Sequence, residues 1–296
     1  MNFLSLLDRI SSVDAPSDAA PRRDLLRQLG QAGARAAVAA LPLALGTPAQ
    51  AAPANNSFDA VVLLLKLEDL LMDFYTKALA APVLTNAAQA AVRLDFVRLQ
   101  QQQQGHARFL RDTLSFAGVT PPPAPSFDFS GRRNNPANPV LFPNVLTDYT
   151  AFLQLAQQLE DASASIYLGQ LAFLTTDKPL FDAVLRMQLV EARHASHVRT
   201  LRRSATPATA VKSWPSTADT APTAAVLVPS TSSSGATPTS IYTFEANERQ
   251  ISTGTTVVPF PTILTGVNAV QSRAFAEAFD EPLPTLQATA LLSIFG

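Results

Sequence analysis

The chain has 296 residues, enough for one large domain or two small ones, and 47% of them are hydrophobic, enough to build a sizeable core. Its 22 Lys and Arg and its 23 Asp and Glu leave a net charge of −1, without the basic excess that nucleic-acid binders carry, so we expect no nucleic-acid partner. The chain has no Cys, which excludes disulfides, thiolate metal sites and Cys nucleophiles.

Residues 1–51 contain the three parts of an export signal. The pair Arg22-Arg23 is followed by a mildly apolar, Ala-rich run at 36–45 and by Ala-Gln-Ala at 49–51, which fits a cleavage site. An arginine pair in this setting resembles a twin-arginine signal and predicts a periplasmic or extracellular protein. The alternative is a short N-terminal helix of the folded domain. The apolar run is too short to span a membrane, and we expect no span in the mature chain.

Four segments of the mature chain show the periodicity of long amphipathic helices. They are residues 57–80, 86–117, 147–174 and 178–203. The second and third are separated by a long Pro-rich connection at 120–143, whereas the other connections are short. This order predicts an all-α fold over residues 52–204, a ferritin-like four-helix bundle with one long crossover.

The composition changes after residue 204. Ser, Thr, Ala and Pro dominate to about residue 240, which indicates a linker or an irregular wrap. Short alternating runs within 241–258 suggest a small hairpin, and helical patterns return at 268–279 and 285–295. We therefore expect residues 205–296 to form an irregular C-terminal extension with short helices that packs on the bundle.

Polar residues interrupt the apolar stripe of each predicted bundle helix near its middle. These residues are Glu68, Gln103, His106, Glu160, Glu191 and His194. A carboxylate in a core is costly unless it is paired or binds a cation, so several at one depth need a common explanation. A metal ion is the economical one, and oxygen and nitrogen ligands suit iron, manganese or zinc.

Each of these residues also has a simpler interpretation. Glu191 and His194, which lie three residues apart on one helix face, could form a buried ion pair with an Arg. Glu68 and Glu160 could lie on an exposed face if their helices were slightly rotated. Gln103 could be an amide satisfied by backbone or water.

The chain also repeats itself. Leu-Glu-Asp occurs at 67–69 and at 159–161, and in each copy a Tyr follows seven residues after the Glu, at Tyr75 and Tyr167. Gln-x-x-His at 103–106 matches Glu-x-x-His at 191–194, and each His is followed by an Arg after five residues. Two similar helical hairpins related by an approximate twofold axis would bring all four polar clusters to one centre. The two Tyr are candidates for a place behind the ligands or for a redox role; the alternative is plain packing.

These residues resemble the ferritin-like di-iron carboxylate superfamily, and specifically its exported ferritin-like domain group, which includes desiccation-related proteins. The superfamily pattern is one Glu from each of two helices and Glu-x-x-His from each of the other two. The resemblance implies that the metal ligands are Glu68, Gln103, His106, Glu160, Glu191 and His194, and that the metal is iron or manganese. The sequence Phe-Asp-Glu-Pro at 279–282 also resembles the C-terminal segment of that group.

One position departs from the superfamily pattern. Gln103 stands where a bridging Glu is expected, so three Glu face the four positive charges of two divalent ions. We therefore expect weakened binding at one of two metal positions, and the number of bound ions, two, one or none, stays open.

Two functions follow from the resemblance. One is a metal-binding oxidoreductase that acts in metal oxidation or in peroxide or oxygen chemistry. The other is a non-catalytic bundle related to stress or desiccation, with a degenerate metal site. Iron storage in a cage is a weaker third option because of the long segment after residue 204. Whether the protein is an enzyme, its substrate and whether it forms a homo-oligomer stay open.

Overall fold

The computed structural model describes residues 56–206, 211–219, 227–229, 238–247, 251–253, 256–258, 273–274 and 276–296. The predicted export signal at 1–51 lies outside these residues. The described residues up to 111 and from 121 onward belong to one compact unit, and all contacts described below lie within it; residues 112–120 fall outside that unit. In the part of the chain that the structure describes, no helix is both long and apolar enough to cross a membrane.

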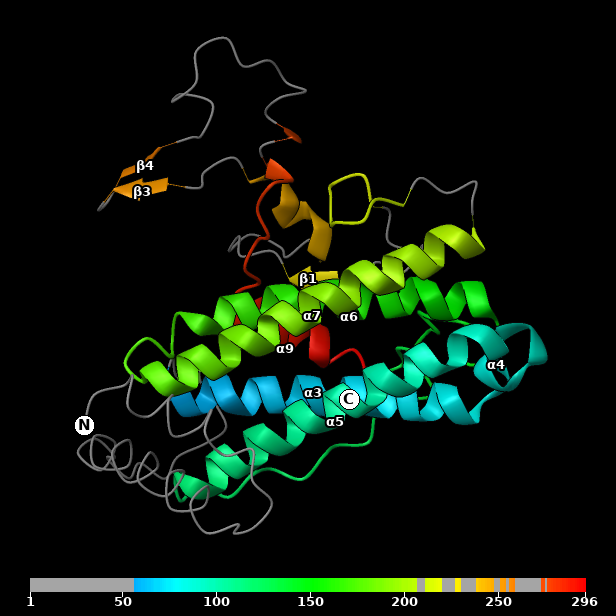
Figure 1. Ribbon diagram of the computed structural model, residues 1–296, viewed down its shortest axis with the longest axis horizontal. Coiled ribbons are helices and arrows are strands. Elements are labelled where there is room, and N and C mark those ends of the chain that lie inside the picture. The colour runs from blue at the N-terminus through cyan, green and yellow to red at the C-terminus, as the bar shows by residue number, and fades with distance from the viewer. Residues whose placement is uncertain are drawn as a thin grey trace, which may run out of the picture. The chain divides into compact units, whose positions relative to one another are not determined.

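Long helices make up most of the described chain. They are α3 (Ser57–Ala80), α5 (Ala90–Phe116), α6 (Tyr149–Leu171) and α7 (Lys178–Ala205), which Figure 1 shows running alongside one another as a bundle. The tightest pair is α6 with α7, and α3 packs against α6. Side-chain hydrogen bonds tie α5 to α3, for example from Gln100 Nε2 to Thr76 Oγ1 at 3.3 Å. The predicted all-α, ferritin-like four-helix architecture is confirmed.

Side-chain caps explain where three of these helices begin. Asn56 accepts a hydrogen bond from the backbone N–H of Asp59 at the start of α3. Asp148 does the same for Ala151 at the start of α6. Asp177 caps α7. Each cap satisfies one of the N–H groups that a helix leaves unpaired in its first turn.

The second predicted helix, 86–117, is shorter than expected. Its first residues form η1 (Ala87–Gln89), a 3₁₀ turn that follows the short helix α4 (Pro82–Thr85). The backbone of Asn86 between them is extended, and its side chain accepts a hydrogen bond from Ala88 N at 3.0 Å. Asn commonly bonds its own backbone in this way, which competes with helix formation and delays the start of α5.

Short strands and a 3₁₀ helix form the first part of the C-terminal extension. β1 (Leu227–Pro229) pairs with β2 (Pro238–Ser240), and β3 (Ile251–Thr253) pairs with β4 (Thr256–Val258), both antiparallel. The hairpin expected within 241–258 is thus formed by β3 and β4. The first residues of that range form the 3₁₀ helix η2 (Ile241–Ala246) instead. Half of the helix expected at 268–279 lies outside the described residues.

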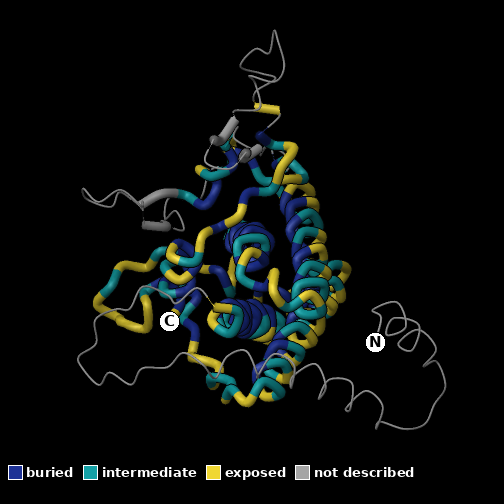
Figure 2. Tube along the Cα trace, turned by 90° about the vertical axis from the view of Figure 1, so that its left-hand side faces the viewer, coloured by how far each residue is buried: buried dark blue, intermediate teal, exposed yellow. Residues whose placement is uncertain are grey.

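The last helix, α9 (Thr285–Leu292), packs against α3 and α6. A glycine makes this docking possible: a Cβ on Gly169 of α6 would lie 2.3 Å from the carbonyl oxygen of Leu283. The N–H of Leu283 donates to the carbonyl of Ser165 at 2.8 Å. Beyond α9, Phe295 stacks on Phe142 of the crossover with ring centroids 5.6 Å apart. These contacts pack the end of the extension against both the bundle and the crossover; Figure 2 marks the buried residues of the described chain in dark blue.

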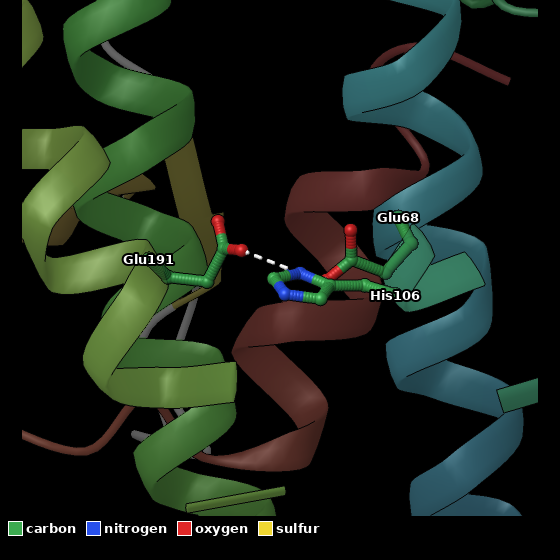
Figure 3. A group of neighbouring side chains, drawn as sticks. All are labelled: Glu68, His106 and Glu191. Carbon is green, nitrogen blue, oxygen red and sulfur yellow. Dashed lines mark ion pairs between the residues drawn. The ribbon is translucent and has the colours of Figure 1, made fainter. Parts of the chain in front are cut away.

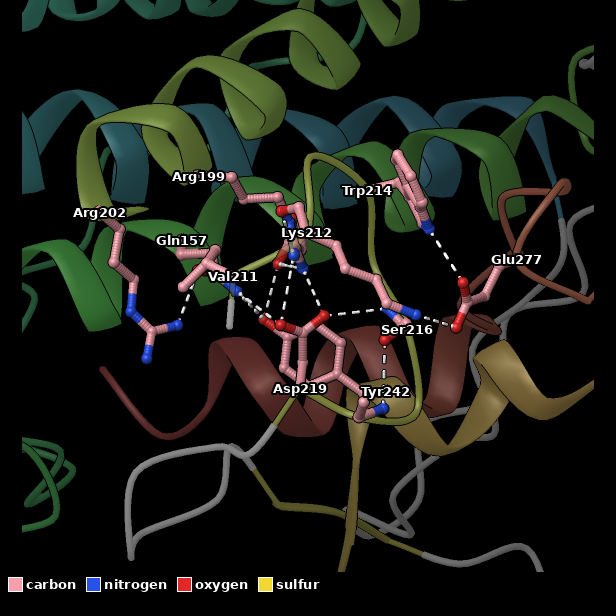
Figure 4. Close-up of polar contacts among 12 residues, drawn as sticks. Gln157, Arg199, Arg202, Val211, Lys212, Trp214, Ser216, Asp219, Tyr242 and Glu277 are labelled. Carbon is pink, nitrogen blue, oxygen red and sulfur yellow. Dashed lines mark hydrogen bonds and ion pairs between the residues drawn. The ribbon is translucent and has the colours of Figure 1, made fainter. Parts of the chain in front are cut away.

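A buried polar network holds the middle of the extension to α6 and α7 (Figure 4). Arg199 of α7 is fully buried, and its guanidinium donates to Asp161 of α6 at 2.6 Å and to Asp219 of the extension at 3.0 Å. Tyr242 of η2 donates its hydroxyl to the same Asp161 at 2.6 Å. Residues 219 and 242 of the extension thus both bond to the buried Arg199–Asp161 pair of α7 and α6. The extension is therefore held on the bundle by charge-assisted hydrogen bonds as well as by apolar packing.

Candidate metal centre

The six residues singled out in the sequence come together in the middle of the bundle, one or two from each long helix. Four of them, Glu68, Gln103, Glu160 and Glu191, have no exposed surface, and His194 is 5% exposed. The side chain of His106 is 14% exposed. The expectation that these polar groups lie in the core, and not on rotated outer faces, therefore agrees with the observed burial.

These side chains form two groups that share Glu191. The first, named the Glu68 position, consists of Glu68, His106 and Glu191, which Figure 3 shows converging from α3, α5 and α7. His106 Nδ1 lies 2.9 Å from Glu191 Oε1 and 3.3 Å from Glu68 Oε1. The second, the Glu160 position, consists of Glu160, Glu191 and His194. His194 Nδ1 lies 3.5 Å from Glu191 Oε2 and 3.7 Å from Glu160 Oε2.

Several ligand atoms of this cluster have no hydrogen-bond partner among the described residues. They are Glu68 Oε2, Gln103 Oε1, His106 Nδ1, Glu160 Oε2 and Glu191 Oε1. Buried polar atoms are nearly always hydrogen-bonded, so five exceptions at one place require an explanation. Although His106 Nδ1 and Glu191 Oε1 are 2.9 Å apart, their orientation does not make a hydrogen bond. Lone pairs that converge without bonding one another fit a cation, and this donor set suits iron, manganese or zinc.

The electrostatics of the cluster also favour a bound positive charge. Burial, together with the charge of Glu191, raises the pKa of Glu68 to about 7. Burial disfavours a charge on His106, but Glu191 and Glu68 beside it raise the pKa of His106 to about 10. Burial alone would raise the pKa of Glu191, whereas His106 and His194 on either side hold that pKa well below its usual range. Without a metal, a proton on His106 supplies positive charge beside Glu68 and Glu191.

The two tyrosines predicted behind the ligands bond across the bundle. Tyr75 of α3 donates its hydroxyl to Glu160 of α6, and Tyr167 of α6 donates its hydroxyl to Glu68 of α3. Burial and the nearby glutamates raise the pKa of both tyrosines well above the usual value, so both remain protonated donors. Each tyrosine therefore orients one carboxylate and leaves its other oxygen free to point into the cluster.

The internal repeat extends to a second layer of ion pairs. Asp69 accepts from Arg111 at 2.6 Å, and the equivalent Asp161 accepts from Arg199, also at 2.6 Å. The arginines that follow each His therefore pair with the aspartate next to each Glu and leave the glutamates to the cluster. His197, by contrast, lies at the rim with its side chain 41% exposed and pairs with Asp95.

The match to known families covers this same region. A family model described as ferritin-like domain matches residues 56–204. The chain belongs to the ferritin-like domain family. The matched segment contains α3 to α7 and all six residues of the cluster, and it ends before the C-terminal extension. No curated protein matches the chain.

Gln103 is the residue that sets this ferritin-like domain apart from the superfamily pattern, and its amide faces inward. Gln103 Nε2 donates to Glu191 Oε2 at 3.0 Å and lies 3.3 Å from His194 Nδ1. Its neighbours in the glutamine run, residues 101, 102 and 104, are exposed. The sequence therefore located the inward-facing member of the run, and the structure adds the atoms that it contacts.

Two further residues of this ferritin-like domain touch the ligands and were not identified from the sequence. Ser163 donates its hydroxyl to Glu191 Oε2 at 3.0 Å, and Gln102 Oε1 contacts His194 Nε2. Ser163 could have been found, because it follows Glu160 by three residues on the same helix face. Gln102 carries no such signal, since it belongs to a uniform run of glutamines.

Proposed function

We propose that this protein is an exported ferritin-like protein that binds iron or manganese in its bundle and uses it in metal oxidation or in peroxide or oxygen chemistry. The observation that carries the proposal is the convergence of buried ligand atoms from Glu68, His106, Glu160 and Glu191 that have no hydrogen-bond partner among the described residues. Buried carboxylates are costly without a positive partner, and a cation bound among them would remove that cost. The ferritin-like family match over the same helices supports metal binding independently.

The chain's own residues would perform three tasks. The carboxylates and imidazoles would hold the ion, and a bound iron or manganese ion supplies the electron chemistry. Tyr75 and Tyr167 would keep Glu160 and Glu68 oriented through their hydroxyls. Helix α9, packed on α3 and α6, would limit the access of water from that side.

Export by a twin-arginine-type signal to the periplasm or beyond is part of this proposal, as is kinship with the desiccation-related group. The support is the Arg22-Arg23 pair, the apolar run that follows it and the cleavage-type sequence at 49–51. N-terminal sequencing of the secreted protein tests this part, and a start near residue 52 is the expected result.

The second candidate function is a non-catalytic bundle related to stress, in which the metal site is degenerate. Gln103 favours it, because a neutral amide stands where a charged ligand is expected. A metal-loaded protein that turns over neither ferrous iron nor peroxide would support this candidate over the first.

The decisive experiment is metal content per chain, measured by elemental analysis after loading with ferrous iron or manganese. We expect Glu191→Ala to lose the metal, because Glu191 belongs to both positions. The matched control is His197→Ala, which removes an imidazole from the same helix outside the cluster and should leave the metal content unchanged. Circular dichroism verifies that both variants fold. Unchanged metal content in folded Glu191→Ala would contradict the proposal.

A further inference from the structure

We infer that the bundle holds a single metal ion at the Glu68 position, and that the carboxamide of Gln103 takes the place of a second ion at the Glu160 position. The inference rests on the proposed function, since it assumes that the cluster binds metal. It adds which of the two positions binds the ion, and it names Gln103 as the residue that prevents binding at the other.

The two carboxylate oxygens of Glu191 differ in their contacts. Oε2, which faces the Glu160 position, accepts hydrogen bonds from Gln103 Nε2 and from Ser163 Oγ, both at 3.0 Å. Oε1, which faces the Glu68 position, has no hydrogen-bond partner within the described part of the chain and lies 2.9 Å from His106 Nδ1. A carboxylate oxygen with two donors has its lone pairs engaged, whereas the other faces an imidazole nitrogen that is itself a metal ligand and can share a cation with it.

The amide nitrogen of Gln103 lies among the atoms that would hold the second ion. It is 3.0 Å from Glu191 Oε2 and 3.3 Å from His194 Nδ1, which are the two ligand atoms that α7 offers to the Glu160 position. The polar N–H groups thus provide the positive partner that a metal would provide. His194 is occupied on its other side as well, because its Nε2 contacts Gln102 Oε1.

The Glu68 position has no counterpart of the two hydrogen-bond donors Gln103 and Ser163. In the internal repeat, the counterpart of Gln103 is Glu191 itself, and the counterpart of Ser163 is Leu71, a buried apolar residue. Among the described residues, one ligand atom from each of Glu68, His106 and Glu191 is buried without a hydrogen-bond partner. All three members of the Glu68 position therefore offer an unengaged atom.

Turning the Gln103 amide over would not restore the second position. Its carbonyl oxygen would then face Glu191 Oε2, so two acceptors would oppose one another in a buried place. The carbonyl also brings no charge. Two divalent ions would leave an excess of positive charge against the three carboxylates, and a buried uncompensated charge is costly. One ion leaves a single negative charge in excess, which the hydrogen bonds that Gln103 and Ser163 donate to Glu191 help to stabilise.

The test is the stoichiometry and location of manganese(II) bound to the full chain, with variants matched by the internal repeat. We expect close to one ion per chain in the native protein and in His194→Ala, and loss of the ion in His106→Ala. Gln103→Glu should bind close to two ions, and its electron paramagnetic resonance spectrum should change from that of an isolated ion to that of a coupled pair. Gln103→Met removes the amide without adding charge and should keep one ion.

Each alternative result separates the inference from the proposed function. No metal in the folded native protein would overturn the proposed function itself. Two ions in the native protein would overturn the inference alone. Loss of the ion in His194→Ala with retention in His106→Ala would place the ion at the other position and overturn it. Loss of the ion in folded Gln103→Met would show that the amide is a ligand. A single ion in Gln103→Glu would show that the amide does not block the second position. Either result would overturn the inference.

Discussion

Tyr75 on α3 donates its hydroxyl to Glu160 on α6, so one half of the bundle holds a carboxylate that belongs to the other half. Tyr167 and Glu68 make the same contact in the opposite direction. The two contacts cross the interface between α3 and α6 and are related by the internal repeat of the sequence. They make the orientation of each ligand depend on the packing of both halves.

Replacing these tyrosines by Phe distinguishes the two metal positions. Tyr167→Phe and Tyr75→Phe should each cost about 1–3 kcal/mol of unfolding free energy, because each leaves a buried carboxylate oxygen without its donor. Only Tyr167→Phe should weaken manganese binding, by about tenfold, since Tyr167 orients Glu68. Urea unfolding and metal titration measure the two effects. Equal losses of affinity in both variants would contradict a single ion at the Glu68 position.

Glycine substitutions test the docking of the C-terminal extension. Gly169→Ala should destabilise the protein and speed proteolysis of the extension, because the new Cβ would lie 2.3 Å from the carbonyl oxygen of Leu283. Gly105→Ala is the matched control within α5, where a Cβ meets nothing within 4 Å. It should stabilise the protein by about 0.5–1 kcal/mol, because Gly costs more backbone entropy than Ala in a helix. If Gly169→Ala stabilised the protein as much as Gly105→Ala, helix propensity would outweigh the contact with Leu283, and the role of Gly169 in docking would be wrong.

The paired arginines provide a second matched comparison. Arg199→Met should cost about 3–5 kcal/mol, since it leaves Asp161 and Asp219 buried without their cation. Arg111→Met should cost less, because the side chain of Arg111 is 31% exposed and water can reach the site of the lost charge. Thermal and urea unfolding measure the difference. A larger loss in Arg111→Met would show that burial does not set the strength of these pairs.

Because of Glu245, we expect the free energy of unfolding to fall as the pH rises. Burial, with the charges of Asp280 and Glu281 nearby, raises the pKa of Glu245 from 4.5 to about 8. Between these values the folded state keeps a proton that the unfolded state has released, so the free energy of unfolding falls as pH rises. Glu245→Gln should make this decline smaller and raise the melting temperature at the upper end of the window.

The control for that experiment is Glu277→Gln. Glu277 already has Lys212 as an ion-pair partner, so its removal should leave the decline in place. If Glu245→Gln and the native protein lost stability equally between the two ends of the window, burial of Glu245 would not be the cause.

The bundle and the cluster were largely predictable because both depend on local patterns. The first predicted helix, 57–80, coincides with α3, since a cap at Asn56 and an apolar stripe that Glu68 interrupts near its middle define it. The six ligand candidates were identified because a polar residue on a buried stripe is visible in the sequence. The two tyrosines were found by their spacing from Glu68 and Glu160, but the crossing of their hydrogen bonds was not, because it depends on how α3 and α6 pack.

The extension was less predictable for a related reason. One anchoring residue, Asp219, bonds to α7 from the Ser-, Thr- and Pro-rich segment, which has no periodicity. The other, Tyr242, bonds to α6 from η2, where short alternating runs had suggested a hairpin. The unequal contacts of the two Glu191 oxygens likewise follow from atomic positions. The start of α5 was also mispredicted. The periodicity alone extends this helix back to residue 86, but the side chain of Asn86 accepts a hydrogen bond from the backbone of Ala88, and the helix begins later.

The contact between Lys66 of α3 and the carbonyl oxygen of Gly296 joins residues 230 positions apart in the chain. Neighbouring helices such as α6 and α7 can meet soon after each forms, because only a short turn separates them. The packing of α9 on α3 must instead close a loop that includes nearly the whole bundle, and long loops slow folding. We therefore expect refolding to be slower than is usual for a helical bundle, because the core is complete only when α9 has packed on α3.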